Sequence, residues 1–164
     1  MGRFKTILHP TDFSPHSQHA FQMASHLAAD SGARLLVLHV LEQPVIVASG
    51  TMMAPMPTGP SAELRQMACE QLAKIKPEDS SVAVEHITEE GDPVTAILDV
   101  AQERDCDLIV IGSHGRTGLG RLLMGSVAEQ IVRRAACAVL TVKLPQAAEK
   151  PRVKTARKEP TKTH

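Results

Sequence analysis

The sequence alternates five short apolar runs with four segments of helical periodicity, and this order restricts the possible fold more than any other feature. Residues 34–40 and 107–111 hold uninterrupted apolar stretches, as expected of strands that are covered on both faces. Runs at 4–9, 82–87 and 138–143 complete the five expected strands. Strands that alternate with helices form parallel sheets through right-handed crossovers. We therefore predict an α/β fold, an open five-stranded parallel sheet with helices on both faces.

Capping signals mark the expected helices. Ser14 and Asp92 are each followed by a proline, so each is expected to be the N-cap of a helix whose first residue is that proline. Gly32 is expected to end the first of these helices. A further helix is expected to run from Ser61 and to end before Pro77. Its apolar positions at helical spacing are Leu64, Met67, Ala68, Leu72 and Ile75.

A glycine-rich stretch, residues 112–126, joins the strand at 107–111 to a helix expected at 126–135. Its glycines let the backbone approach a ligand closely, and turns of this kind free main-chain amides that can bind an anion. The first N–H groups of the next helix also favour negative charge, and Arg116 and Arg121 add guanidinium groups suited to phosphate. The spacing matches neither a Walker A loop nor a dinucleotide fingerprint. We predict a phosphate-binding loop.

Several of these polar residues also have a purely structural interpretation. Ser126 and Glu129 fit a capping box, in which the serine hydroxyl would serve the helix alone. Asp12 suits either a nucleoside contact or the chemistry of a turn. His114 is placed to contact phosphate or simply to shape the loop. Other histidines, which we expect on a solvated helix face rather than at a metal, are His16, His19 and His26.

Composition narrows the class of protein. The chain has 164 residues, of which 43% are hydrophobic and 22% charged, and this balance suits one globular domain. No apolar run approaches the roughly 20 residues that span a bilayer, and the N-terminus lacks a signal-peptide pattern, so no membrane role is expected. The cysteines are odd in number and lack C-x-x-C spacing, so we expect core or semi-buried thiols and a cytoplasmic location. They are Cys69, Cys106 and Cys137.

Charge and proline content separate a tail from the body. Residues 145–164 carry a net charge of +4 against −4 for residues 1–144. The tail has few large apolar side chains and is predicted to be disordered. A nucleic-acid role for it is disfavoured, since no aromatic platform or DNA-binding motif accompanies the charge. The connection at 41–60, rich in proline, glycine and methionine, is interpreted as either a lid or a variable loop.

The glycine pattern Gly112-x2-Gly115-x9-Gly125-Ser126 resembles the ATP-binding signature of the universal stress protein family. Segments 5–14 and 137–142 are similar to the family as well, and the resemblance covers about residues 3–143. It implies the sheet order 3-2-1-4-5 of an adenine nucleotide alpha hydrolase-like domain, spanning 1–144 here. It also implies a homodimer paired through the last strand, 138–143.

The family resemblance further implies an ATP ligand, with Mg²⁺ or Mn²⁺, bound by a protein that acts as a nucleotide-dependent sensor or switch in stress response. Asp12, Pro10, Thr11 and Val40 would lie against the nucleoside, and the glycine-rich loop and the start of the next helix would wrap the phosphates. The phosphate-binding positions are Gly112, Ser113, His114, Gly115, Arg116, Thr117, Gly118, Gly125, Ser126, Val127 and Ala128.

The sequence departs from the family pattern in three places, one of which is the tail that extends beyond the usual end of the domain. Ala138 replaces a proline that usually follows the cysteine before the last strand, and Ala128 stands where some ATP-binding members offer a hydroxyl. No catalytic motif is identifiable, so efficient turnover is not expected and ATP hydrolysis should be slow at most. Two alternatives stay open, a stress adaptor that binds no nucleotide and a slow ATP hydrolase. The protein partner is unknown.

Overall fold

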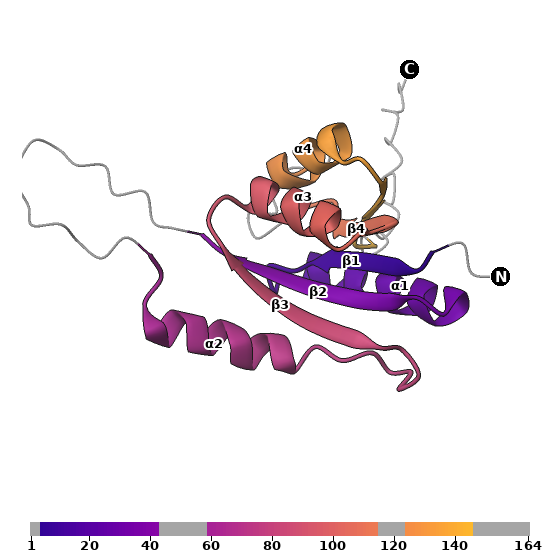
Figure 1. The fold of residues 1–164 in the computed structure, drawn as a ribbon, viewed down its shortest axis with the longest axis horizontal. Coiled ribbons are helices and arrows are strands. Elements are labelled where there is room, and N and C mark those ends of the chain that lie inside the picture. The colour runs from indigo at the N-terminus through magenta and orange to yellow at the C-terminus, as the bar shows by residue number, and fades with distance from the viewer. Residues whose placement is uncertain (1–3, 43–58, 115–123, 146–164) are drawn as a thin grey trace, which may run out of the picture.

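The computed structural model, which describes residues 4–42, 59–114 and 124–145, shows a parallel sheet with helices on both faces (Figure 1). The strand order is β3-β2-β1-β4-β5, as predicted, and every neighbouring pair is parallel. The strands are β1 (Thr6–Pro10), β2 (Arg34–Leu41), β3 (Val84–Glu90), β4 (Leu108–Gly112) and β5 (Ala138–Val142). The helices are α1 (Pro15–Ser31), α2 (Ala62–Ala73), α3 (Pro93–Glu103) and α4 (Ser126–Arg134).

Two apolar clusters hold the layers together, one on each face of the sheet. Ile7 of β1 packs in the cluster formed with α1 and α2, whereas the next residue, Leu8, packs in the cluster formed with α3 and α4. Successive side chains of a strand point to opposite faces, so a central strand must be apolar at every position. This requirement explains the uninterrupted apolar runs in the sequence. No helix among the described residues has the length and apolar character needed to cross a bilayer.

The predicted helix caps are confirmed. The Ser14 hydroxyl accepts a hydrogen bond from the Ser17 amide at 3.2 Å, and the Asp92 carboxylate accepts one from the Thr95 amide at 2.9 Å. Hydrogen bonds from the amide and the hydroxyl of Thr95 hold the pKa of Asp92 below its ordinary value. Gly32 ends α1 with a φ of 67°, a left-handed conformation that glycine adopts without strain.

Strand β3 begins two residues later and ends three residues later than the predicted 82–87. The three added residues are polar, yet the pairing with β2 continues to Leu41 opposite Glu90. The polar residues can stay in the strand because β3 is at the edge of the sheet, where one face is open to water. Main-chain pairing with the long neighbouring strand, rather than side-chain pattern, therefore sets where β3 ends.

Helix α2 ends earlier than predicted, and two of its apolar residues are exposed. Leu64 is 44% exposed and Met67 is 56% exposed, and the helix ends at Ala73, short of Ile75. Helix α2 runs alongside the edge strand β3 (Figure 1), so only a narrow stripe of it, Ala68 and Leu72, is buried. Cys69, expected to be core or semi-buried, is also exposed on this helix.

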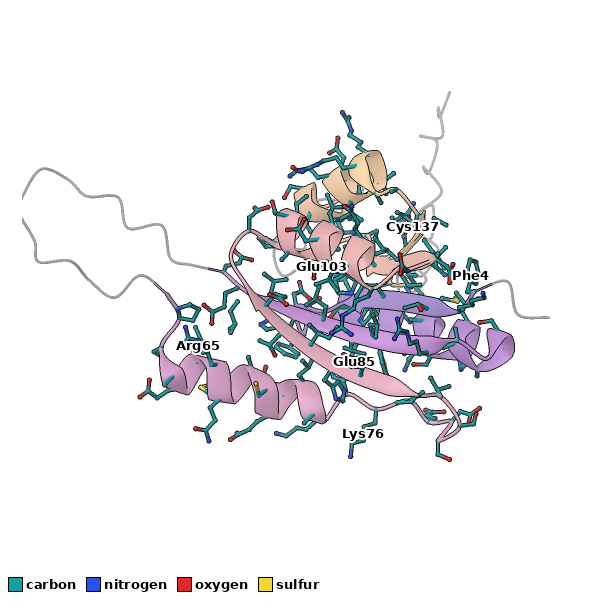
Figure 2. All side chains as sticks on the ribbon, viewed as in Figure 1. Phe4, Arg65, Lys76, Glu85, Glu103 and Cys137 are labelled. Atoms are coloured by element: carbon teal, nitrogen blue, oxygen red, sulfur yellow. The ribbon has the colours of Figure 1, made fainter. Side chains whose placement is uncertain are left out.

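An exposed ion pair ties α2 to the end of β3. The Arg65 guanidinium donates two hydrogen bonds to the Glu90 carboxylate, the longer at 3.2 Å. The position of Arg65 near the start of α2 is visible in Figure 2. Because both side chains are solvent-exposed, this pair orients α2 more than it stabilises the fold.

His9 is a polar residue at the centre of the sheet. Its side chain is fully buried, its Nδ1 lies 2.9 Å from the Val110 carbonyl oxygen, and its ring centroid is 5.7 Å from that of Phe21. Because a carbonyl can only accept, Nδ1 carries the proton. The Nε2 atom is buried and has no hydrogen-bond partner among the described residues. Burial lowers the pKa of His9 to about 4.

The buried imidazole should make the fold sensitive to acid. The unfolded chain takes up a proton at His9 near its ordinary pKa of 6.5, but the folded chain does so only near 4. The free energy of unfolding should therefore be highest above pH 6.5 and should fall as the pH drops through this window, by about 2 kcal/mol between pH 7 and 5. Urea unfolding of His9→Leu at both pH values should show that this part of the pH dependence is lost. His26→Gln, which removes an exposed histidine, is the matched control, and an equal loss in both variants would contradict the assignment.

Candidate functional site

The predicted site lies at a switch point, the place where the strand order reverses between β1 and β4. The pairing of these two strands covers only Ile7 with Leu108 and Leu8 with Ile109, whereas β1 continues to pair with β2 as far as Pro10 opposite Leu38. Pro10 has no N–H to donate to β4, so the ladder cannot continue on that side. In open α/β sheets, ligands bind outside the carboxyl ends of the strands at such a point.

The turn between β1 and α1 is held by its own polar side chains. The Asp12 carboxylate accepts a hydrogen bond from the Ser14 amide at 3.0 Å, and the Thr11 hydroxyl accepts one from the Phe13 amide at 3.1 Å. These bonds keep Phe13 at a φ of 63°, a conformation that few non-glycine residues adopt. The turn chemistry considered for Asp12 is therefore present, and it fixes one carboxylate oxygen.

Thr11 is engaged entirely within the protein. Its amide donates to the Leu38 carbonyl at 2.8 Å, its own carbonyl lies 2.8 Å from Nδ1 of His39, and its hydroxyl lies 3.0 Å from that of Ser17. With 7% exposure, the side chain is buried. Thr11 therefore positions the turn.

His39 and Phe13 support this turn and were not singled out from the sequence. Their ring centroids are 4.3 Å apart, and His39 is 7% exposed. The available signal was a histidine within the otherwise apolar run of β2, next to its carboxyl end. A polar ring at such a position needs a partner, and here the partner is the main chain of the β1–α1 turn.

The two ends of the glycine-rich stretch meet in space. The Ser113 amide donates to the Val142 carbonyl at 2.9 Å, and the Gly125 amide donates to the Ser113 carbonyl at 2.7 Å. The chain therefore leaves β4 and enters α4 at one place, beside the end of β5. Gly115, Arg116, Thr117 and Gly118, predicted to bind phosphate, lie outside the described residues, as do 43–58 and the tail from residue 146.

His114 stands at the first of these two ends. Its Nδ1 lies 3.0 Å from the Ser113 hydroxyl, and its ring centroid is 5.7 Å from that of His16. Its Nε2 is buried and has no hydrogen-bond partner among the described residues. His16 is thus half-buried against His114, in contrast to the solvated face predicted for it, while His26 is exposed. Among the described residues, no group of three ligating side chains could hold a metal ion.

Gly112 is required for packing as well as for any ligand. A Cβ atom at this position would lie 3.1 Å from the main-chain oxygen of His16, in the first turn of α1. Backbone atoms of a helix cannot move aside as a flexible side chain can. The glycine therefore lets α1 approach the end of β4, which brings the β1–α1 turn and the glycine-rich stretch together.

Helix α4 begins without a side-chain cap, so the capping-box interpretation of Ser126 and Glu129 is wrong. The N-cap is Gly125, which has no side chain to cap the first turn, and Ser126 is an exposed first helical residue. Glu129 instead pairs with Arg133 at 2.8 Å. A helix leaves its first N–H groups without intrahelical acceptors, and these groups favour an anion.

The remaining predicted contacts differ in what they can offer a ligand. Ala128 is 3% exposed and belongs to the core cluster of α3 and α4. Val127 and Val40 are partly buried and pack against this cluster. The side chain of Ala128 is therefore committed to the core, and its contribution at the start of α4 is its main-chain amide. The structure brings together the β1–α1 turn, the end of β4 and the start of α4.

A separate shallow groove of about 250 Å³ lies between the end of β3 and α3. Acidic residues dominate its lining, among them Glu89, Asp99 and Glu103. Like charges repel, so this groove is unsuited to phosphate. The switch point, where Asp12 is the single acid that we assign and where α4 begins, is better suited to an anion.

Comparison with known proteins identifies the family. The sequence profile of the Universal stress protein family matches residues 3–143, and the chain belongs to this family. It is 35% identical over 150 residues to Universal stress protein MJ0531 of Methanocaldococcus jannaschii, with 87% of this chain and 84% of the relative covered.

Solved structures agree with this family. Protein MJ0577 of the same organism superposes with a TM-score of 0.66 at 26% identity, covering 87% of this chain and 98% of that one. A universal stress protein in complex with cAMP superposes with a TM-score of 0.56 at 28% identity, covering 85% of this chain and 96% of that one. The fold is therefore shared with a universal stress protein whose structure contains cAMP.

The close approach at Gly112 gives a test of packing. Gly112→Ala should lower the free energy of unfolding by about 1–3 kcal/mol, since its Cβ meets the backbone of α1. Gly112→Val should lower it further, because a steric cause grows with side-chain size. Thermal melts of both variants without ligand measure the effect. Melting temperatures equal to that of the unsubstituted protein would show that α1 does not press on this position.

Proposed function

We propose that this chain is an ATP-binding universal stress protein that acts as a nucleotide-dependent sensor or switch in stress response. One observation carries the proposal: α4 starts without a side-chain cap, directly beside the end of β4 and at the switch point of the sheet. The first amides of α4, which have no intrahelical acceptor, would donate to the phosphate that the glycine signature predicts.

The buried Nε2 of His114 gives further support. A buried nitrogen without a partner is unfavourable unless something else bonds to it. If Nδ1 accepts from the Ser113 hydroxyl, Nε2 carries the proton and is a donor for a phosphate oxygen. A bound phosphate would thereby satisfy the nitrogen.

Each part of the site has a distinct role in the proposal. Asp12, Pro10 and Val40 would border the nucleoside, with the Asp12 carboxylate as the acceptor for a ribose hydroxyl. The stretch 112–118 and the amides of 125–128 take the phosphates, and the Ser126 hydroxyl adds a contact that helix capping does not consume. Mg²⁺ or Mn²⁺ would be held mainly by phosphate oxygens, since Asp12 is the single acid that we assign to this site.

Binding without efficient turnover is the expected mode of action. Phosphoryl transfer needs a positioned water and a base in addition to the metal, and we assign no residue to either role. Nucleotide would act by favouring one arrangement of the glycine-rich stretch, and a protein partner would recognise that arrangement. A slow ATP hydrolase and an adaptor that binds no nucleotide are the two alternatives, and the experiment below distinguishes them.

Calorimetric titration of nucleotide-stripped protein with ATP and Mg²⁺ tests the proposal. Saturation near one ATP per chain is expected, and ATP at about 100 times its Kd should raise the melting temperature by roughly 5–10 °C. The double variant Gly115→Val with Ser126→Ala should lose binding and keep the fold. Ser61→Ala, which removes the cap of the distant helix α2, is the control and should bind normally.

The outcomes separate the alternatives. No binding at millimolar ATP would favour the adaptor, and rapid phosphate release with Mg²⁺ or Mn²⁺ would favour the hydrolase. Unchanged affinity in the double variant would contradict the site assignment while leaving nucleotide binding intact.

We also propose that the chain forms a homodimer through β5. This strand is at the edge of the sheet, and its apolar residue Leu140 is 36% exposed. The Val142 carbonyl faces β4, so the N–H groups of Val139 and Thr141 face outward, because main-chain groups alternate sides along a strand. An edge of this kind is suited to antiparallel pairing about a two-fold axis.

Proline at an outward position should break this pairing. Thr141→Pro removes an outward N–H and leaves the hydrogen bonds to β4 intact, so analytical ultracentrifugation should show a monomer with a native circular dichroism spectrum. Thr141→Val keeps the N–H and should remain dimeric. A dimeric proline variant would place the interface elsewhere.

A further inference from the structure

Two of the three cysteines lie at the amino ends of neighbouring strands, a placement that the proposed function does not use. Cys106 is two residues before β4 and Cys137 is one residue before β5. Figure 2 shows Cys137 at the side of the sheet where Phe4 leads into β1. This is the opposite end of the sheet from the switch point.

The register of the two strands sets the spacing of these cysteines. Leu108 pairs with Ala138, so Asp107 precedes β4 opposite Cys137, and Cys106 is one residue further back. Neighbouring strands lie about 4.8 Å apart, so the register brings the two cysteines to adjacent places at this end of the sheet. Disulfides usually span a Cα separation of about 4.4–6.8 Å.

Both thiols are on the same face of the sheet. Cys106 is a member of the core cluster beneath α3 and α4, and Cys137 packs against that cluster. A helix-ending turn directs Cys106 there: Asp105 has a φ of 47°, and the Cys106 amide donates to the Ala101 carbonyl at 2.9 Å. This is the Schellman arrangement, in which the residue after the left-handed position folds back onto the helix.

The two thiols differ in access to solvent. Cys106 is 8% exposed, whereas Cys137 is half-buried. Burial raises the pKa of both thiols, and that of Cys106 reaches about 11. The nearby Cys137 also contributes to the raised pKa of Cys106. Both are therefore protonated at neutral pH and react slowly, with Cys137 the more accessible of the two.

We propose that Cys106 and Cys137 form a reversible intramolecular disulfide when the protein meets a hydroperoxide. The Cys137 thiolate attacks the outer oxygen of the hydroperoxide and becomes a sulfenic acid, while the O–O bond breaks and the remainder leaves as the alcohol, or as water when the oxidant is hydrogen peroxide. The Cys106 thiol then attacks that sulfur, forms the S–S bond and releases the sulfenic oxygen as water. The two cysteines supply the two electrons that reduce the peroxide, and a dithiol reductant reverses the reaction.

The disulfide would enclose residues 106–137, which contain β4, the glycine-rich stretch and α4. A cross-link that closes a loop restricts the unfolded chain and so raises stability. The oxidised protein should therefore melt at a higher temperature than the reduced one, whether or not the protein binds nucleotide.

The test uses the full chain with Cys69→Ser, which removes the exposed thiol of α2 and with it the risk of links between molecules. Reduced protein is treated with hydrogen peroxide, and its thiols are counted under denaturing conditions. We expect loss of two thiols per chain, a Cys106–Cys137 peptide in the non-reducing mass spectrum, and a melting temperature higher by roughly 5–10 °C. The reaction should be at least tenfold faster at pH 9 than at pH 7, because thiolate is the reactive form.

Adding Cys106→Ser is the matched control. In that variant Cys137 should be oxidised singly, with no internal cross-link and no rise in melting temperature. The proposal is overturned if both thiols of the parent remain titratable after peroxide treatment. It is also overturned if Cys137 is oxidised while Cys106 stays free, or if the cross-links found join separate chains.

Discussion

The separation of β1 from β4 is the constraint on which the candidate site depends. Pro10 has no N–H to donate to β4. The main-chain pairing of the two strands therefore covers only two residue pairs, Ile7 with Leu108 and Leu8 with Ile109. His9 then donates to the Val110 carbonyl through its ring. Beyond this point the chain turns away on one side into α1 and on the other into the glycine-rich stretch, so both segments are placed at one end of the sheet.

Polar groups beneath α1 keep this arrangement specific. Thr11 bonds to Leu38, Ser17 and His39, and Gly112 allows the first turn of α1 to approach β4. Leu38, Ser17 and His39 are not among the residues to which we assign a ligand contact. These contacts hold the β1–α1 turn and the start of α4 in fixed positions, as a preorganised binding site requires.

The alternating apolar runs and caps such as Ser14 and Asp92 were sufficient to predict the strands and most helix starts, because these signals act locally. The strand order was predicted from the family resemblance. The sequence was insufficient where tertiary contacts decide. The end of β3 follows its pairing with β2, and the exposure of Leu64 and Met67 follows from the position of α2 beside an edge strand. The capping box failed because Ser126 is one residue too late to be the N-cap.

The candidate site shows the same division. A signature identified Gly112 and Gly125, but their structural reasons, the approach of α1 and the bond to Ser113, appear only in three dimensions. His9 and His39 were not singled out, since a histidine within an apolar strand gives no sign of its partner. Gly115, Arg116, Thr117 and Gly118 stay predictions, as they lie outside the described residues.

Amide hydrogen exchange with and without ATP and Mg²⁺, resolved to short peptides, tests the central claim most directly. If nucleotide binds at the switch point, added protection should concentrate at 11–14, at 112–114 and in the first turn of α4. Protection that is unchanged by ATP, or that appears instead at the acidic groove between β3 and α3, would contradict the account.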